Sequence, residues 1–217
     1  MPDQPHPEPP APAAETYLIA AHPDWSTSRV NGEVLEVVRS LPGVLVNDLY
    51  GSYPDYDIDV PLEQTRLAAA RLVVLQFPVT WYSVPPLLKL WLDEVLALGW
   101  AYGRAGTALQ GKHLWLVAST GGPQDTYSPA GYNRFDFDAY LLPLRQVAHL
   151  CGMCWLPPMV LHGANGVTQA RIVEHAAQVG ERLRSWPAWV GAGIDTPGAS
   201  ADIPVSDRPP ALVQRAP

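Results

Sequence analysis

The chain has 217 residues, enough for one α/β domain with a sizeable core, and its hydrophobic content of 47% argues against wholesale disorder. Lys and Arg number 14 against 21 Asp and Glu, so the formal net charge of -7 argues against binding to nucleic acid or an anionic membrane. No apolar run approaches the roughly 20 residues that span a bilayer, and the start lacks a secretory signal pattern, so we expect a cytoplasmic protein without direct membrane insertion.

Proline and alanine dominate both ends of the chain, and segments of this composition offer little surface to bury. We therefore expect residues 1–15 to form a disordered extension and residues 187–217 a flexible tail, in which several prolines prevent a long helix. The folded domain is predicted to cover residues 16–186.

Within this domain, short apolar segments alternate with helical patterns. Segment 72–77 is continuously apolar, which is typical of a central strand covered on both faces. Segment 87–98 carries apolar residues all round, which favours burial against the sheet and against a second subunit. The expected strands are 17–21, 44–48, 72–77, 113–120 and 155–161, and the expected helices are 28–40, 62–70, 87–98, 137–150 with a break at Pro143, and 168–186.

This alternation predicts parallel strands joined by right-handed crossovers. The modest length favours a flavodoxin-like three-layer sandwich over a longer two-half dinucleotide fold. We expect a five-stranded parallel sheet of order 2-1-3-4-5 with helices on both faces. In such sheets, ligands bind at the carboxyl ends of the strands.

The two cysteines, Cys151 and Cys154, form a Cys-Gly-Met-Cys motif. It would be a redox pair if it opened a helix and lowered the pKa of one thiol. The preferred interpretation is that it closes a helix, with Gly152 as a left-handed cap before the next strand. Zinc is not supported, because no second cysteine pair or matched histidine pair accompanies it.

The loop after the first expected strand is rich in hydroxyl groups between Ser26 and Asn31 and opens a helix. Backbone N–H groups, hydroxyls and the helix dipole can converge there on a phosphate, and His22 can donate a hydrogen bond to it. The alternative is that Ser26 or Ser28 only caps the helix and His22 is an ordinary loop residue.

The loop after the central strand places Trp81 and Tyr82 between Pro78 and Pro85. A rigid backbone there can present N–H groups to the polar edge of a flat heterocycle while aromatic side chains flank it. The alternative is a hydrophobic plug between the sheet and the next helix.

The loop after the fourth expected strand runs from Ser119 to Tyr127 and contains Gly121 and Gly122. Paired glycines let the backbone approach a ligand closely, and their N–H groups can stabilise negative charge. The alternative is an ordinary Gly-Gly-Pro turn. Because the three loops follow strands that are neighbours in the expected order, we expect them to line one crevice, and together they indicate a flavin nucleotide. No Gly-x-Gly-x-x-Gly turn, nucleoside-triphosphate loop or Gly-x-Ser-x-Gly elbow is present.

Several segments together resemble a known family. They are Ala21-His22-Pro23, Trp81-Tyr82-Ser83-Val84-Pro85-Pro86-Leu87-Leu88-Lys89-Leu90-Trp91, Gly99-Trp100-Ala101-Tyr102-Gly103, Gly106-Thr107-Ala108-Leu109, Thr120-Gly121-Gly122 and Trp155-Leu156-Pro157-Pro158. The chain resembles the flavodoxin-like NAD(P)H:quinone oxidoreductases, in particular the compact bacterial branch that includes the ancillary protein of glutathione-regulated potassium efflux systems. The resemblance spans residues 17–186.

The resemblance implies a homodimer with flavin sites at the subunit interface, and hydride transfer from NADPH or NADH through FMN, or alternatively FAD, to a quinone. It also implies residue roles. The phosphate region would be held by His22, Ser28 and Asn31, the isoalloxazine by Pro78, Val79, Trp81 and Tyr82, and its polar edge by Thr120, Gly121 and Gly122, while Tyr127 would face the substrate.

One position departs from this pattern. Many relatives carry a histidine six positions beyond the residue that matches Tyr127, and this chain carries Asn133 there. An amide donates a hydrogen bond but does not become a cation near neutral pH. We therefore expect catalysis to use Tyr127, Asn133 and backbone N–H groups. Two other functions stay open at this point: a regulatory subunit of a potassium efflux antiporter, and a flavodoxin-type electron carrier.

Overall fold

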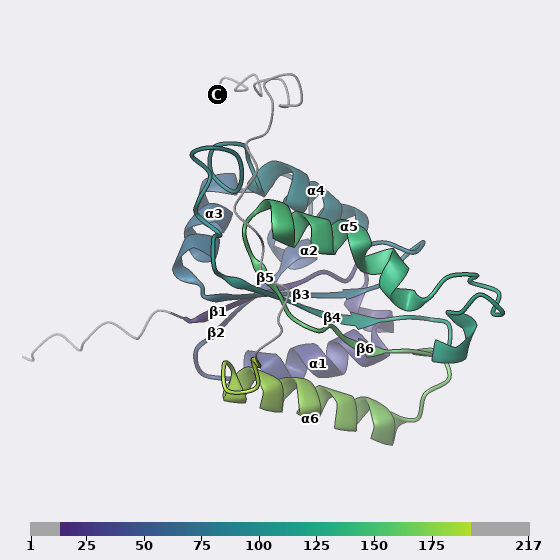
Figure 1. Ribbon diagram of the computed structural model, residues 1–217. Helices are drawn as coiled ribbons and strands as arrows, with labels where there is room; N and C mark the ends of the chain where they lie inside the picture. The colour runs from purple at the N-terminus through teal and green to yellow at the C-terminus, as the bar shows by residue number, and fades with distance from the viewer. Residues whose placement is uncertain (1–13, 192–217) are drawn as a thin grey trace, which may run out of the picture.

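The computed structural model describes residues 14–191, so most of the two expected terminal extensions lies outside the described residues. Six parallel strands form one sheet between two layers of helices (Figure 1). The sheet has the order β2-β1-β3-β4-β5, and β6 also pairs with β4. The predicted order 2-1-3-4-5 is confirmed. The strands are β1 (Thr16–Ala20), β2 (Val44–Asp48), β3 (Leu72–Pro78), β4 (His113–Ser119), β5 (Cys154–Trp155) and β6 (Met159–Leu161).

The expected single strand 155–161 is wrong in one respect, because the structure divides it into β5 and β6. Pro157 and Pro158 lie between the two strands, and proline has no N–H to give to a sheet. β5 pairs with the start of β4 and β6 with its end. Pro157 nevertheless contributes to the packing, because its carbonyl accepts a hydrogen bond from the Trp115 indole at 3.1 Å.

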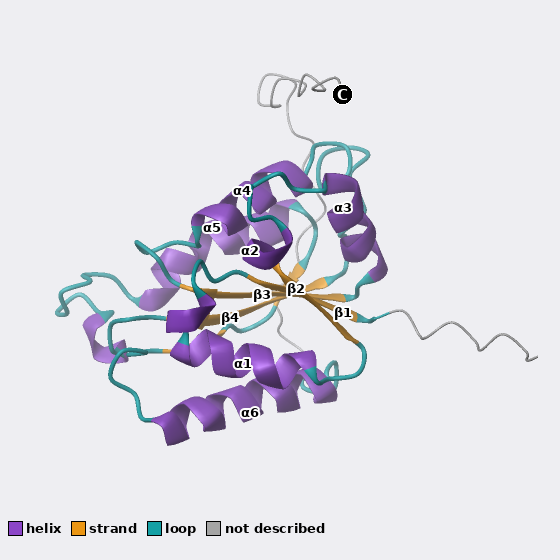
Figure 2. Ribbon diagram, turned by 180° about the vertical axis from the view of Figure 1, so that it is seen from behind, coloured by secondary structure: helices purple, strands orange, loops and turns teal. Residues whose placement is uncertain are grey.

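Helices cover both faces of the sheet (Figure 2). On one face α1 lies beside α6, and on the other lie α2, α3, α4 and α5. The α-helices are α1 (Arg29–Arg39), α2 (Leu49–Ser52), α3 (Val60–Ala69), α4 (Pro86–Val95), α5 (Phe137–Leu150) and α6 (Gln169–Ser185), and two short 3₁₀ helices are η1 (Trp25–Thr27) and η2 (Gln124–Thr126).

Alternation along the strands divides the core into two halves. In β1, Leu18 packs toward α1 and α6, whereas Tyr17 and Ile19 pack on the opposite side. Residues 72–77 of β3 are all buried, which confirms the expected central strand with two covered faces.

Three helices differ from expectation. α5 runs through Pro143 without the expected break, since Leu141 and Leu144 on either side of the proline are buried in the core and hold the helix. α4 ends at Val95 instead of residue 98. α2 was not expected; the Asp48 side chain caps it by accepting from the Gly51 N–H at 3.2 Å.

A buried carboxylate ties α3 to the sheet and to α4. Glu63 is fully buried and accepts hydrogen bonds from the Tyr17 hydroxyl at 2.5 Å and the Trp91 indole at 2.8 Å. Tyr53 donates to it at 2.7 Å, and Arg66 pairs with it at 2.8 Å. Burial is the main cause that raises the pKa of Tyr17, so its hydroxyl stays a donor. The charge is thus compensated within the core.

Candidate functional site

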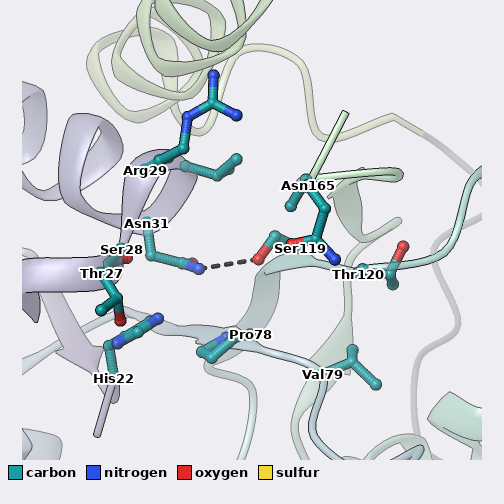
Figure 3. A pocket seen from close by; sticks show the side chains of 13 residues that line it. His22, Thr27, Ser28, Arg29, Asn31, Pro78, Val79, Ser119, Thr120 and Asn165 are labelled. Carbon is teal, nitrogen blue, oxygen red and sulfur yellow. Dashed lines mark hydrogen bonds between the residues drawn. The ribbon is translucent and has the colours of Figure 1, made fainter. Parts of the chain in front are cut away.

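A pocket lies at the carboxyl ends of β1, β3 and β4 (Figure 3). Its volume of about 160 Å³ suits part of a ligand, because sites for whole drug-sized molecules measure about 300–1,000 Å³. Of the predicted site residues, the structure brings these together in its lining: His22, Ser28, Asn31, Pro78, Val79, Thr120 and Gly121. Also lining it are Thr27, Arg29, Val30, Ser119, Ala164 and Asn165.

The start of α1 forms one wall of the pocket. Ser28 caps this helix, and its hydroxyl oxygen accepts from the Gly32 N–H at 3.1 Å. The capping alternative therefore holds for Ser28, while Ser26 donates to Asp24 instead. The N–H groups of residues 29–31 have no partner inside the helix and adjoin the pocket. A helix start of this kind favours an anion.

His22 lies just after the end of β1, and one of its ring nitrogens already has a hydrogen-bond partner. Its Nδ1 accepts a hydrogen bond from the Asp24 N–H at 3.1 Å. Burial is the main cause that lowers the pKa of His22 below its ordinary value. A neutral imidazole whose Nδ1 accepts carries its proton on Nε2, so His22 offers an Nε2–H donor at the pocket.

Asn31 connects two walls of the pocket. Its Nδ2 donates to Ser119 Oγ at 2.8 Å, as Figure 3 shows. Its carbonyl accepts from Gln76 Nε2 at 2.7 Å, so β3 holds the same helical turn. Both Asn31 and Ser119 are buried. Asn31 is therefore a brace of the pocket as well as a lining residue, which sequence reasoning did not distinguish.

Arg29 carries the permanent positive charge among the residues that line this pocket. Its guanidinium donates to the Val167 carbonyl at 3.1 Å. The bond attaches the start of α1 to the segment that leads into α6. A ligand phosphate at the helix start would thus meet mostly neutral donors, with one cation nearby.

Trp81 and Tyr82 do not line the pocket but lie in the adjoining loop after β3. Thr80 and Ser83 exchange two backbone hydrogen bonds of 2.9 and 3.0 Å around them. Trp81 has φ +47° and Tyr82 φ +64°, a left-handed backbone that is unusual for bulky residues. Trp81 is 89% exposed, and Tyr82 stacks on Tyr140 at 5.1 Å. The plug alternative is wrong for Trp81, because its ring is not packed between the sheet and a helix.

The loop after β4 presents free backbone donors. The Thr120 carbonyl accepts from the Ala164 N–H at 2.8 Å, and the Gly122 carbonyl accepts from the Gly163 N–H at 2.9 Å. In the part of the chain that the structure describes, the N–H groups of Gly121 and Gly122 donate to no other residue. Gly121 lines the pocket; Gly122 does not. Two adjacent unpartnered N–H groups suit a ligand edge with acceptor atoms.

Gly122 lies beneath the loop that carries Tyr127 and Asn133. A Cβ on this glycine would stand 2.7 Å from the hydroxyl at the end of the exposed Tyr132 side chain, which would have to move aside. Asn133 is buried, and its Nδ2 donates to Thr126 Oγ1 at 2.8 Å. Neither Tyr127 nor Asn133 lines the pocket.

Tyr127 lies in an aromatic cluster beside that loop. Its ring contacts Phe137 at 5.2 Å and Tyr140 at 5.9 Å, both edge to face. Burial is the main cause that raises the pKa of Tyr127 above its ordinary value, so the hydroxyl is a neutral donor at physiological pH.

Sequence reasoning missed the segment after β6. His162, Ala164 and Asn165 come directly after that strand, and the last two line the pocket. The Asn165 side-chain amide lies 3.2 Å from the place where a Cβ on Gly121 would stand. The signal was available: the sequence His-Gly-Ala-Asn-Gly follows a strand at the same edge of the sheet as the other loops.

The cysteines take no part in this pocket. Cys151 ends α5, and Gly152 follows with φ +71°, so the helix-closing interpretation is confirmed. Both thiols are free, and burial raises the pKa of Cys151 to about 12.

Among the described residues there is no cluster of three potential metal ligands. No helix in residues 14–191 has the length and apolarity to cross a membrane.

Comparison with known proteins finds the same fold. The profile of a family with the flavodoxin-like fold matches residues 14–183. The glutathione-regulated potassium-efflux system ancillary protein KefF of Citrobacter koseri is 44% identical over 169 residues, which are 78% of this chain and 95% of that protein.

Solved structures agree with the family match. A general stress protein 14 from Treponema denticola in complex with FMN superposes with a TM-score of 0.75 at 35% identity, over 79% of this chain and 98% of that one. A protein from P. pentosaceus named as an NADPH-quinone reductase gives a TM-score of 0.68 at 28% identity, over 76% and 97%. A structure named as a thermophilic tryptophan halogenase from Streptomycin violaceusniger gives 0.75 at 39%, over 77% and 97%.

Proposed function

This chain belongs to the family with the flavodoxin-like fold, and from that premise we propose that it is an FMN-dependent NAD(P)H:quinone oxidoreductase. The observation that carries the proposal is the pocket at the carboxyl ends of β1, β3 and β4, where a helix start meets Gly121, the first of two adjacent glycines whose N–H groups have no partner among the described residues. FMN is preferred to FAD because a similar protein from Treponema denticola is known in complex with FMN.

The first half of the site fits a phosphate monoester. The N–H groups of residues 29–31, the Ser28 hydroxyl and His22 Nε2–H are donors around a small volume. These groups would hold the phosphate of FMN by hydrogen bonds and the dipole of α1. Asn31 would keep the helix start in place through Ser119.

The second half fits the polar edge of a flat heterocycle. The Gly121 and Gly122 N–H groups would donate to its carbonyl and nitrogen acceptors, with Pro78 and Val79 beside it. When bound, FMN supplies the chemistry, since its ring takes a hydride and passes it on. The two glycine N–H groups would stabilise the negative charge that this transfer leaves.

The aromatic residues near the site would position the two substrates. Trp81, exposed on its strained turn, and Tyr127, with a neutral hydroxyl, would flank the bound ring. Tyr127 would donate to an oxygen of the quinone, and the rings would stack the nicotinamide and then the quinone in the same place. Asn133 would support this loop through Thr126 instead of donating to the substrate.

We propose that the protein is a cytoplasmic homodimer, and exposed apolar side chains support the dimer. Tyr132, Phe135 and Leu142 are exposed around the loop and helix that follow the glycines. A second copy that covered them would complete the wall of the flavin site. Sedimentation of the purified protein tests this, and a species of one chain's mass at micromolar concentration would contradict it.

Steady-state kinetics test the reaction. A single place used by both substrates predicts ping-pong kinetics, with parallel double-reciprocal lines when NAD(P)H and a benzoquinone are both varied. Intersecting lines would contradict the shared place, and no quinone-dependent oxidation of NADH or NADPH would contradict the reaction. Product analysis with tryptophan and halide in the same assay shows whether the activity named for the Streptomycin violaceusniger structure occurs instead.

The similarity to KefF supports a second candidate function, regulation of a potassium efflux antiporter. The two functions are compatible, because a flavin site can be occupied while another surface contacts a membrane protein. Co-purification of the tagged chain with an antiporter of its own cell tests this proposal, and the absence of any such antiporter from the purified material would contradict it.

A further inference from the structure

The imidazole of His162 contacts the loop that presents the glycine N–H groups. Its Nδ1 lies 2.9 Å from Thr120 Oγ1. The ring also lies 5.3 Å from that of Tyr127 and 4.8 Å from that of Phe137. His162 therefore lies between the proposed flavin edge and the proposed substrate tyrosine, although it does not line the pocket itself.

The proton of the Thr120 hydroxyl decides which nitrogen of His162 is protonated. Thr120 Oγ1 donates to the Gly122 carbonyl at 2.8 Å. A hydroxyl has one proton to give, so its contact with the imidazole is one in which oxygen accepts and Nδ1–H donates. In the neutral ring, Nε2 then carries the lone pair.

The contact between His162 and Thr120 adds to backbone hydrogen bonds that hold the loop after β4 against the segment after β6. The Thr120 N–H donates to the Leu161 carbonyl at 3.1 Å, and the N–H groups of Gly163 and Ala164 donate back to the carbonyls of Gly122 and Thr120. The Gly122 carbonyl thus accepts from both Gly163 and the Thr120 hydroxyl. With both carbonyls held on the side of β6, the neighbouring glycine N–H groups are left for a ligand.

We propose that His162 is a positioning residue of the flavin site, whose Nδ1–H fixes the Thr120 hydroxyl and, through it, the orientation of the Gly121 and Gly122 N–H groups. The inference rests on the proposed function, because FMN is the ligand that these N–H groups would meet. It assigns a role in the site to the segment after β6, which the sequence motifs did not identify.

The surroundings of His162 keep the ring neutral. Burial lowers its pKa below the ordinary value, and no charged side chain among residues 14–191 contributes to that change. Thr120 after β4 is hydrogen-bonded to it, α5 contacts it through Phe137, and the loop after η2 contacts it through Tyr127, whose own pKa is raised by burial. At neutral pH the ring therefore acts as a fixed donor.

Substitutions that keep or remove the donor test the proposal. His162→Asn retains an N–H near the place of Nδ1, whereas His162→Leu removes it. For the full chain, we expect His162→Leu to weaken the affinity for FMN about tenfold, the loss of one hydrogen bond, and His162→Asn to stay within about threefold of the unsubstituted protein. The matched control is His113→Leu at the opposite end of β4, which should leave FMN affinity unchanged.

A second pair reports on the same bond if His162→Leu does not fold. Thr120→Val removes the hydroxyl and should weaken FMN binding about as much as His162→Leu, while Thr120→Ser retains it and should not. In a double-mutant cycle, Thr120→Val should add little to His162→Leu. Equal affinities for FMN across both pairs, or fully additive losses, would overturn the proposal.

Nitrogen NMR of His162 separates this inference from the proposed function. Before FMN is added, the spectrum at neutral pH should show Nδ1 protonated and Nε2 unprotonated. The opposite tautomer would overturn the role of His162 even in a protein that binds FMN. A protein with the expected tautomer that takes up no FMN would overturn the proposed function, and the inference would fall with it.

Discussion

The Asn31 side chain donates to Ser119 Oγ at 2.8 Å and so joins the first turn of α1 to the end of β4. Two walls of the pocket, which are 88 residues apart in the sequence, are held together by this one bond between buried groups. We infer that this bond helps to set the separation between the phosphate side and the glycine side of the proposed site.

Asn31→Ala should therefore loosen the pocket and the fold together. Removing one partner leaves Ser119 buried without its donor, which costs about 1–3 kcal/mol in the free energy of unfolding. FMN affinity should fall as well, because the helix start is no longer braced. Urea unfolding and FMN titration check the two effects. Ser119→Ala should add little to Asn31→Ala in a double-mutant cycle, and fully additive effects would contradict the brace.

Trp81 and Tyr82 adopt a left-handed backbone that costs stability. We therefore predict that this turn is kept because it serves function. Asparagine tolerates this backbone far better than tryptophan, and the exposed Trp81 ring has little buried area to lose. Trp81→Asn should raise the free energy of unfolding by about 1 kcal/mol and raise the KM for the quinone. Denaturant unfolding and steady-state kinetics measure the two. A destabilised variant with unchanged kinetics would show that the turn is not a strained functional element.

Tyr82→Asn is the companion variant for that turn. It relieves similar strain at φ +64° but removes the ring that stacks on Tyr140. Its gain in the free energy of unfolding should be smaller than that of Trp81→Asn, since a stacked aromatic pair contributes about 0.5–1.5 kcal/mol. The reverse order of the two variants would contradict this account.

Glu63→Gln should be among the more damaging single substitutions on the α3 side. The amide has a similar shape but brings its own N–H groups to a place where Tyr17, Tyr53 and Trp91 all donate. Loss of the charge also leaves Arg66 without its partner. We expect the free energy of unfolding to fall by about 3 kcal/mol. Glu36→Gln, at an exposed position, is the matched control, and an equal effect of both would contradict the proposed network.

His175 should make stability depend on pH. It is buried in α6, and burial lowers its pKa from 6.5 to about 4. The unfolded chain therefore binds a proton between these values that the folded chain does not, so its contribution to stability is present above about pH 6.5 and is lost toward pH 4.

The loss amounts to at most about 3 kcal/mol, at 1.36 kcal/mol per pKa unit. His175→Gln removes this titration and should flatten the fall in the free energy of unfolding between pH 6.5 and 4. Urea unfolding at several pH values measures the slope for both proteins. An unchanged slope in the variant would show that other groups cause the acid sensitivity.

The sheet order and the three loops were predictable because their signals are local. Strand 72–77 is apolar throughout, and Gly121-Gly122 follows a strand directly. Pro157 and Pro158 divide the last strand into β5 and β6, and the prediction of one strand over 155–161 did not take these prolines into account. The strain at Trp81 was not predictable, because no residue propensity places tryptophan in a left-handed backbone conformation.

The role of the segment after β6 depended on contacts across the fold. His162 and Thr120 are 42 residues apart, and only the pairing of β6 with β4 brings them together. In the same way, the sequence favoured Asn31 and Asn133 as ligand donors, whereas the structure gives Ser119 and Thr126 as their partners. Residue type identified the region of the site, but the hydrogen bonds that set each role are between distant segments.

Uptake of FMN by the purified full-length chain tests the central claim most directly. The absorbance spectrum of the protein mixed with FMN and freed of excess ligand should be that of a bound flavin, at about one FMN per chain, and addition of NADH or NADPH without oxygen should bleach it. A protein that stays colourless after this treatment would contradict the account.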